Sequence, residues 1–143
     1  MAKLNVYLNF PGTTEKAFAF YRSIFGGEYS NIQRFKETPE AGQIPANEQN
    51  LLMHVALPIG DGDVLMGTDA RESIGQKLTA GDNFHLSFEA DSKADAARVH
   101  AALAKGGKVT MPLADTFWGA YFGMVTDPFN IRWMVSFTER KPR

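Results

Sequence analysis

The chain contains no cysteine, which excludes disulfide bonds, thiolate metal sites and cysteine nucleophiles. It also has no excess of charge of either sign, because 15 Lys and Arg residues stand against 16 Asp and Glu residues, giving a formal net charge of -1. Proteins that bind nucleic acid usually carry a concentrated basic surplus. We therefore expect no nucleic-acid partner.

Long apolar runs are also missing. No uninterrupted apolar stretch approaches the roughly 18 residues that a membrane span needs, and the N-terminal residues lack the pattern of a signal peptide. A Walker loop and a dinucleotide-binding fingerprint are absent as well. We expect a cytoplasmic protein that does not associate with membranes.

The first half of the chain has the pattern of a strand, a helix and a hairpin. Lys3 to Phe10 alternates between apolar and polar residues, which predicts a strand. Thr13 or Thr14 is the expected N-cap of a helix that ends at Gly26-Gly27. A weak strand, a long polar loop and a hairpin follow at 28–35, 36–50 and 51–66. The turn of this hairpin is Gly60-Asp61-Gly62-Asp63.

The second half repeats this order. A strand at 83–90 precedes a helix capped by Asp91 or Ser92 and stopped by Gly106-Gly107. Further strands are expected at 108–111 and within 118–137. In the alignment of the two halves, Tyr7-Leu8-Asn9-Phe10 matches His85-Leu86-Ser87-Phe88, and Leu65-Met66 matches Trp133-Met134.

Neither half is large enough to bury a sheet face alone, whereas two paired copies are. The sequence therefore predicts an α+β fold of tandem βαβββ modules, 1–75 and 76–143. Their curved mixed sheets are expected to form one shared open-barrel groove, with the helices outside.

An ordered set of short motifs resembles a known superfamily. The motifs are Tyr7-Leu8-Asn9-Phe10, Phe25-Gly26-Gly27, Leu65-Met66 with Asp69, residues 107–113, Asp115-Thr116-Phe117-Trp118-Gly119, Tyr121-Phe122-Gly123 and Asp127-Pro128-Phe129. Together they resemble the glyoxalase, bleomycin-resistance and extradiol-dioxygenase proteins (the vicinal oxygen chelate superfamily), and the PhnB-like branch in particular. The resemblance implies a homodimer.

Members of that branch are often labelled methyltransferases of the ubiquinone pathway. A methyltransferase of the usual kind needs a Gly-rich turn between a strand and a helix to hold its nucleoside cofactor. Since no such turn is visible, we do not expect this activity.

In the wider superfamily, four inward-facing strand positions hold a divalent metal. The resemblance places them near Tyr7, Met66, His85 and Met134. Of the four residues, only His85 is a common metal ligand, since the Met thioethers suit soft ions. A metal site of this kind needs three or four ligands, and one imidazole does not suffice. We expect no metal and no cofactor, and keep a divalent metal as the alternative.

Three histidines require an interpretation. His85 is the candidate catalytic residue, as a general base or an orienting donor, or else a half-buried histidine bonded to a neighbour. His54 is either a ligand-binding residue or, as the alternation favours, a surface or edge residue. We expect His100 to face solvent on the second helix.

Aromatic residues form the other candidate group. Phe117, Trp118 and Tyr121 either line a pocket that stacks on a planar ligand or pack in the core beside a capped turn. Of Trp133 and Met134, only one can face the groove, and the alignment favours Met134. The full set of candidate ligand-binding residues is Tyr7, Asn9, His54, Met66, Ser87, Phe117, Trp118, Tyr121, Trp133 and Met134.

The leading hypothesis is a small-molecule-binding protein with an aromatic-lined groove. Its ligand would be planar or apolar, with a polar handle near Asn9, His85 or Ser87. One alternative is a metal-dependent lyase, isomerase or dioxygenase of the same superfamily, and another is a resistance protein that sequesters a drug. The residues leave open whether any reaction is catalysed.

Overall fold

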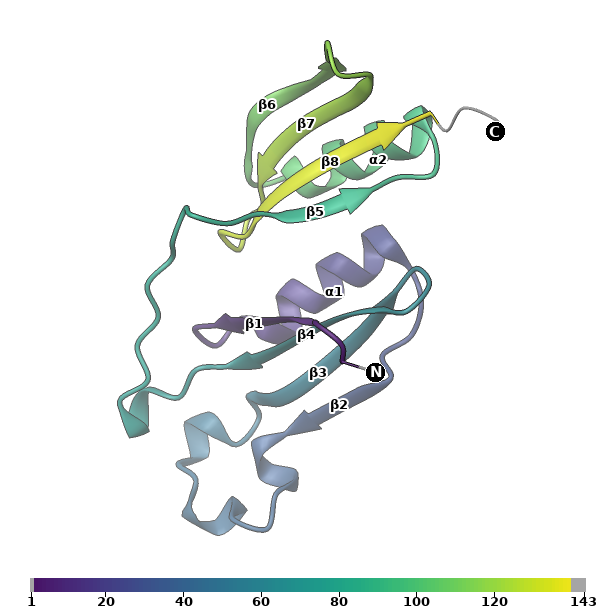
Figure 1. Cartoon of the computed structure of the whole chain (residues 1–143). Coiled ribbons are helices and arrows are strands. Elements are labelled where there is room, and N and C mark those ends of the chain that lie inside the picture. The colour runs from purple at the N-terminus through teal and green to yellow at the C-terminus, as the bar shows by residue number, and fades with distance from the viewer. Residues whose placement is uncertain (1, 140–143) are drawn as a thin grey trace. The chain divides into compact units, whose positions relative to one another are not determined.

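The computed structural model describes residues 2–139 and divides into two compact units, Met1–Thr79 and Ala80–Arg143. Within the described residues each unit has one α-helix and a four-stranded mixed sheet, in the order βαβββ (Figure 1). The α+β class and the tandem repeat predicted from the sequence are confirmed, and the sheets are open. The groove shared by the two sheets stays a prediction.

The first unit contains a sheet of strand order β1-β4-β3-β2. Its elements are β1 (Val6–Phe10), α1 (Thr14–Phe25), β2 (Asn31–Arg34), β3 (Leu52–Ile59) and β4 (Asp63–Asp69). Strand β1 runs parallel to β4, while the other pairs are antiparallel. The two strands that follow the long loop thus pair as the predicted hairpin, and β1 joins the sheet beside its last strand.

Helix α1 covers one face of this sheet. Leu8 and Val55 are buried on that face, and both are register partners of Gly67 in β4. The Phe18 ring packs against Gly67 so closely that a Cβ atom there would lie 2.6 Å from Cε1 of the ring. Because side chains alternate along a strand, the residues directly before and after Leu8, Val55 and Gly67 lie on the opposite face of the sheet.

The N-terminus of α1 is not capped as the sequence predicts. Thr13 occupies the N-cap position, but its side chain makes no capping hydrogen bond, and Thr14 is the first helical residue. The carboxylate of Asp69 accepts the Thr14 backbone N–H instead, with an N–Oδ1 distance of 3.0 Å. The cap comes from a strand 55 residues away, so no local pattern could show it.

The long loop is built from short 3₁₀ helices. They are η1 (Phe35–Glu37), η2 (Ala41–Gln43) and η3 (Ala46–Glu48), and a fourth, η4 (Glu72–Ile74), follows β4. The Gln49 side-chain amide donates to the carbonyl oxygens of Ala41 and Ile44. These bonds give residues 36–50 a defined path despite their polar, proline-containing sequence.

The second unit has the corresponding strand order β5-β8-β7-β6. Its elements are β5 (Leu86–Glu89), α2 (Lys93–Ala104), β6 (Lys108–Asp115), β7 (Ala120–Thr126) and β8 (Arg132–Thr138). Ser92 caps α2 as predicted, since its hydroxyl accepts the backbone N–H of Asp95. None of the helices within residues 2–139 is long and apolar enough to cross a membrane.

His100 does not face solvent, so that prediction is wrong. Its side chain is buried with 8% exposure, and Nε2 lies 3.1 Å from the carbonyl oxygen of Met111. Helical spacing puts it on the same stripe as Ala96 and Leu103, and Gly123 leaves room for the ring, since a Cβ atom there would lie 2.9 Å from Nε2.

The strand registers also revise the alignment of the two halves. Tyr7 is the register partner of Met66 in the first sheet, and Ser87 is the register partner of Met134 in the second. With Met66 and Met134 equivalent, Tyr7 corresponds to Ser87 and not to His85. The sequence alignment was wrong by two residues here, a shift that preserves alternation and therefore leaves no trace in the pattern.

Candidate functional site

The face of the first sheet that α1 does not cover carries several polar or soft side chains, and six of them are considered together. They are Tyr7 and Asn9 on β1, Met66 and Thr68 on β4, His54 on β3 and Gln33 on β2. We call this set the open face. Asn9 is the register partner of Thr68, and Gln33 is that of His54, so hydrogen-bonding side chains run across all four strands. None of the six is an acid, a lysine or an arginine.

Tyr7 and His54 meet on the open face. The phenol oxygen lies 3.0 Å from Nδ1 of His54, and the two ring centroids are 5.6 Å apart with a tilt of 32°. Burial raises the pKa of Tyr7, while a hydrogen bond with the Thr68 side chain acts in the opposite direction. The phenol therefore stays neutral at physiological pH and still exposes 44% of its surface.

The alternation favoured a surface or edge position for His54, and His54 lies on the open face but not at the edge of the sheet. It lies on β3, which pairs with β2 on one side and β4 on the other, and its side chain is half-buried. The sequence-based set also missed Thr68 and Gln33. Thr68 could have been found, because it stands two residues after Met66 in a strand and shares its face.

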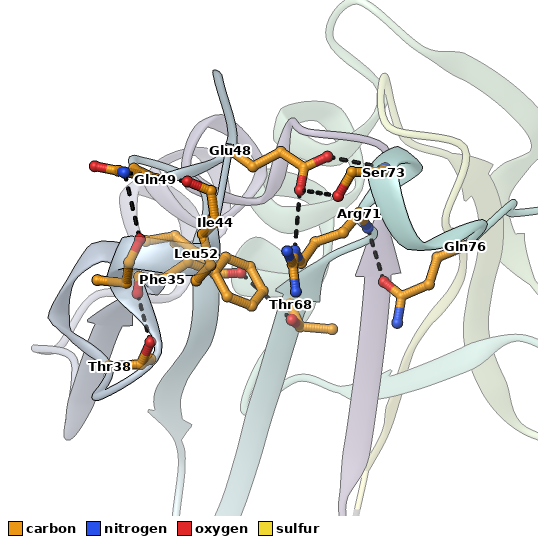
Figure 2. A network of polar contacts seen from close by, with 11 residues as sticks. Phe35, Thr38, Ile44, Glu48, Gln49, Leu52, Thr68, Arg71, Ser73 and Gln76 are labelled. Atoms are coloured by element: carbon orange, nitrogen blue, oxygen red, sulfur yellow. Dashed lines mark hydrogen bonds and ion pairs between the residues drawn. The ribbon is translucent and has the colours of Figure 1, made fainter. Parts of the chain in front are cut away.

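A polar network ties the long loop to the segment after β4 (Figure 2). The buried carboxylate of Glu48 accepts the Ser73 hydroxyl at 2.6 Å and the Ser73 backbone N–H at 3.0 Å. It also forms an ion pair with Arg71 at 3.0 Å. The hydrogen bond from the Ser73 side chain is the main cause that lowers the pKa of Glu48.

The guanidinium of Arg71 continues this network toward the sheet. Its Cζ atom lies 5.1 Å from the centroid of the Phe35 ring, and Gln76 accepts the Arg71 backbone N–H through Oε1 at 2.7 Å. Both charges of the ion pair are therefore engaged with each other and with neighbours. The network holds structure in place and leaves the uncharged open face as the better candidate for binding.

A cleft of about 600 Å³ also lies in the first unit. Pro11, Asn47, Glu72 and Lys77 are among its lining residues, and none of the residues predicted to bind a ligand is. Its lining combines Glu48, the acid of the ion pair with Arg71, with separate surface side chains. The cleft therefore presents no convergent set of functional groups.

In the second unit the candidates separate. Ser87 and Met134 share the face opposite α2, where Met134 is also the register partner of Met124. His85 is half-buried directly ahead of β5. Phe117 and Trp118 lie in the turn between β6 and β7, with 99% and 58% exposure, so the interpretation as core packing is wrong for both.

Trp133 and Tyr121 lie on the face that α2 covers. Trp133 is buried with 4% exposure, and its indole N–H donates to Oδ2 of Asp127 at 2.9 Å. The ammonium of Lys93, in α2, lies 5.0 Å from the centroid of the Tyr121 ring. Neither ring lines the face that carries Ser87 and Met134. Of Trp133 and Met134, it is Met134 that faces away from α2, as the alignment favoured.

The donor chemistry does not fit the metal of the wider superfamily. At the strand positions that the resemblance implies for ligands, Tyr7 pairs with Met66 in the first sheet and Ser87 with Met134 in the second. They offer a phenol and a thioether in one unit and a hydroxyl and a thioether in the other. Thioethers suit soft ions, not the hard or borderline ions used for such chemistry. Within either unit, the described residues contain no group of three or more His, Asp or Glu side chains placed to hold a metal.

Comparison with known proteins identifies the family. The family model of the glyoxalase/bleomycin resistance protein/dioxygenase superfamily matches residues 3–135. The chain belongs to this superfamily. The chain is also 30% identical to Protein YjdN of Escherichia coli K12, over 97% of either sequence.

Solved structures share the fold over nearly the whole chain. Protein PA1353 from Pseudomonas aeruginosa is 35% identical, with a TM-score of 0.85 over 98% of this chain and 100% of that one. A PhnB protein from Bacillus cereus, described as a putative 3-demethylubiquinone-9 3-methyltransferase, is 22% identical with a TM-score of 0.77, covering 96% and 100% of the two chains. This likeness shows that the two proteins share the fold.

Proposed function

We propose that this superfamily member binds a small planar or apolar molecule on the open face of the first sheet, without the divalent metal that the resemblance implies for the wider superfamily. The observation that carries the proposal is the Tyr7–His54 pair, which sits on an uncharged face beside the Met66 thioether. Planar ligands favour such a combination of apolar surface with a few fixed polar groups.

The uncharged character of the open face limits the ligand. A carboxylate or phosphate ligand would leave water for a set of side chains that includes no lysine or arginine to compensate its charge, which costs free energy. A neutral molecule loses little on the same transfer and gains contact with the Tyr7 ring and with Met66. This favours uncharged ligands with an aromatic or otherwise flat body.

A direct test is titration of the isotope-labelled protein with 2-methoxynaphthalene, a flat and uncharged probe. We expect saturable chemical-shift changes at Tyr7, Met66 and Thr68. Met66→Lys should weaken binding at least about fivefold, because it places a charge on the open face. Val109→Lys, at an exposed position of β6, is the matched control and should bind as the native protein does. Shift changes confined to other residues would contradict the proposal.

Metal analysis tests the second part of the proposal. Protein purified without chelator should contain far less than one equivalent of Zn, Ni, Mn or Fe. A near-stoichiometric content of any of them would favour the metal-dependent lyase, isomerase or dioxygenase. Mass spectrometry of a bound ligand then separates the remaining alternatives, since a sequestering protein releases its ligand unchanged.

A further inference from the structure

The face of the second sheet that lies opposite α2 carries a row of thioethers. Met111 in β6 pairs with Met124 in β7, and Met124 pairs with Met134 in β8. Ser87 in β5 continues the row as the register partner of Met134. Because directly paired residues of neighbouring strands point to the same side of a sheet, these four side chains share one surface. We call this side of the second sheet the methionine face.

Aromatic rings lie at one end of the methionine face. Phe122 stands two residues before Met124 in β7 and therefore points to the same side of the sheet. The Trp118 ring packs against Phe122, with ring centroids 5.8 Å apart and an interplanar angle of 66°. Trp118 remains exposed beside it. This end therefore offers ring surface to the apolar part of a ligand.

Positive charge lies at the other end of the methionine face. Thr126 stands two residues after Met124, and its register partners are Lys108 in β6 and Arg132 in β8. Arg132 is half-buried, and within residues 80–139 its guanidinium forms no ion pair. A partly buried charge without a partner costs free energy. An anion bound beside Arg132 would offset this cost.

A pocket of about 280 Å³ lies beside this cation. Thr126, Asn130 and Arg132 line it together with residues 80–82. A hydroxyl, an amide N–H and a guanidinium can all donate hydrogen bonds to one anionic group. Asp82 is the acid among these lining residues, but its side chain is exposed, so water screens its charge more than that of Arg132. The pocket therefore favours an anion.

The distance between the two ends sets the length of a ligand that uses both. Phe122 and Thr126 are four positions apart in β7, which corresponds to roughly 13 Å at about 3.3 Å per residue. The aromatic end also carries negative charge, because the exposed Glu89 is the partner of Ser136, which pairs with Phe122. An anionic ligand in the reverse orientation would meet this carboxylate, so its charged group belongs at the Arg132 end.

We propose that the methionine face binds an elongated carboxylate, with the charged group at Arg132 and the apolar end against Trp118 and Phe122. This site lies within the second unit and goes beyond the function proposed for the open face of the first sheet. The flexible thioethers between the two ends adapt to the chain that connects the charge to the apolar group.

The probe for this site is 8-phenyloctanoate, which carries a phenyl ring and a carboxylate at opposite ends of a flexible chain. In the native protein with ¹³C-labelled methionine methyl groups, we expect saturable shifts of the Met124 and Met134 resonances. The alcohol 8-phenyloctan-1-ol has the same length without the charge and should bind at least about fivefold more weakly. Phenylacetate has the charge without the length and should also bind more weakly than 8-phenyloctanoate.

Two substitutions test the charge selection by calorimetric titration. Arg132→Gln should weaken 8-phenyloctanoate binding at least about fivefold and remove the preference over the alcohol. Arg98→Gln, on the exposed side of α2, is the matched control and should bind as the native protein does. Asp82→Asn should bind 8-phenyloctanoate equally or more tightly, since it removes a charge that repels an anion.

Several results would overturn the proposal without touching the function proposed for the open face. They are equal binding of the acid and the alcohol to native protein, methyl shifts confined to Met66, and no binding of 8-phenyloctanoate at millimolar concentration. Weaker binding by Asp82→Asn would show that the pocket selects cations and would overturn it as well. The native protein and Asp82→Asn decide the question even where Arg132→Gln fails to fold.

Discussion

The carboxylate of Asp69, at the last position of β4, accepts both the backbone N–H and the hydroxyl of Thr14 through Oδ1, at 3.0 and 2.6 Å. Its other oxygen, Oδ2, accepts the backbone N–H of Leu52 at 2.9 Å. Asp69 itself is buried. One carboxylate thus joins the start of α1, the start of β3 and the end of β4, and it places negative charge at a helix N-terminus, where the helix dipole favours it.

Asp69→Ala should therefore lower the free energy of unfolding by about 2–4 kcal/mol, since it leaves buried donors without acceptors. Asp69→Asn should recover only part of this loss, because its amide group would direct N–H toward one of the donors. Urea unfolding measures both. Asp61→Asn, in the exposed turn between β3 and β4, is the control, and a loss as large as that of Asp69→Asn would contradict this account.

The Glu48 network should make the long loop sensitive to acid. The pKa of Glu48 is lowered in the folded protein, so its contribution to stability is complete above the ordinary carboxyl pKa and is lost as the pH falls through the lowered value. Amide exchange of Ser73, followed between about pH 5 and pH 3, should accelerate beyond its intrinsic pH dependence.

The matched variants for this prediction are Glu48→Gln and Glu40→Gln. Glu48→Gln should show fast exchange at Ser73 throughout the range, because a neutral amide cannot replace the ion pair with Arg71. Glu40→Gln removes an exposed acid of the same loop and should behave as the native protein does. Unchanged exchange in Glu48→Gln would show that the network does not hold the loop.

The second Gly-Gly pair offers a sharper test of close packing. A Cβ atom on Gly107 would lie 2.8 Å from the carbonyl carbon of Asp127 and nearer still to the Thr126 carbonyl oxygen. Since backbone atoms cannot move aside as a flexible side chain can, Gly107→Ala should cost about 1–3 kcal/mol or more. A Cβ atom on Gly42 would meet nothing within 4 Å, so Gly42→Ala should change stability by less than about 0.5 kcal/mol. Thermal unfolding compares the two.

The sequence could predict elements that depend on local pattern. The alternation in Lys3 to Phe10, the Ser92 cap and the glycine pairs all describe neighbours in the chain, and the structure has each of them near the expected position. The parallel pairing of β1 with β4 has no such local signal and was not predicted. From the sequence, Gly107 was interpreted only as part of the pair that ends the second helix. Its close approach to Thr126 joins residues that are distant in the chain, so no local pattern indicates it.

What the sequence could not predict depends on contacts between distant residues. The cap from Asp69, the burial of His100 and the bond between Tyr7 and His54 each join residues on different elements. Alternation along a strand gives the same face again after a shift of two residues. The sequence alignment therefore matched Tyr7 with His85, although the registers match it with Ser87. The alternation in the sequence indicates which face of a sheet a residue lies on, but only the strand registers show which residues are paired.

The two tryptophans provide an optical test of the corrected faces. Trp133 is buried against the α2 side of its sheet and bonded to Asp127, whereas Trp118 is exposed in the β6–β7 turn. Trp118→Phe should therefore leave blue-shifted emission that iodide quenches weakly, and Trp133→Phe should leave red-shifted emission that iodide quenches strongly.

The same variants report on the indole bond. Trp133→Phe also removes the donor to a buried carboxylate, which should lower the free energy of unfolding by about 1–3 kcal/mol, while Trp118→Phe should change it by less than about 0.5 kcal/mol. Strong quenching of the emission that remains in Trp118→Phe would mean that Trp133 is open to solvent. In that case the face carrying Met134 would not be the outward one, and the sequence-based placement of Trp133 as a ligand-binding residue would return.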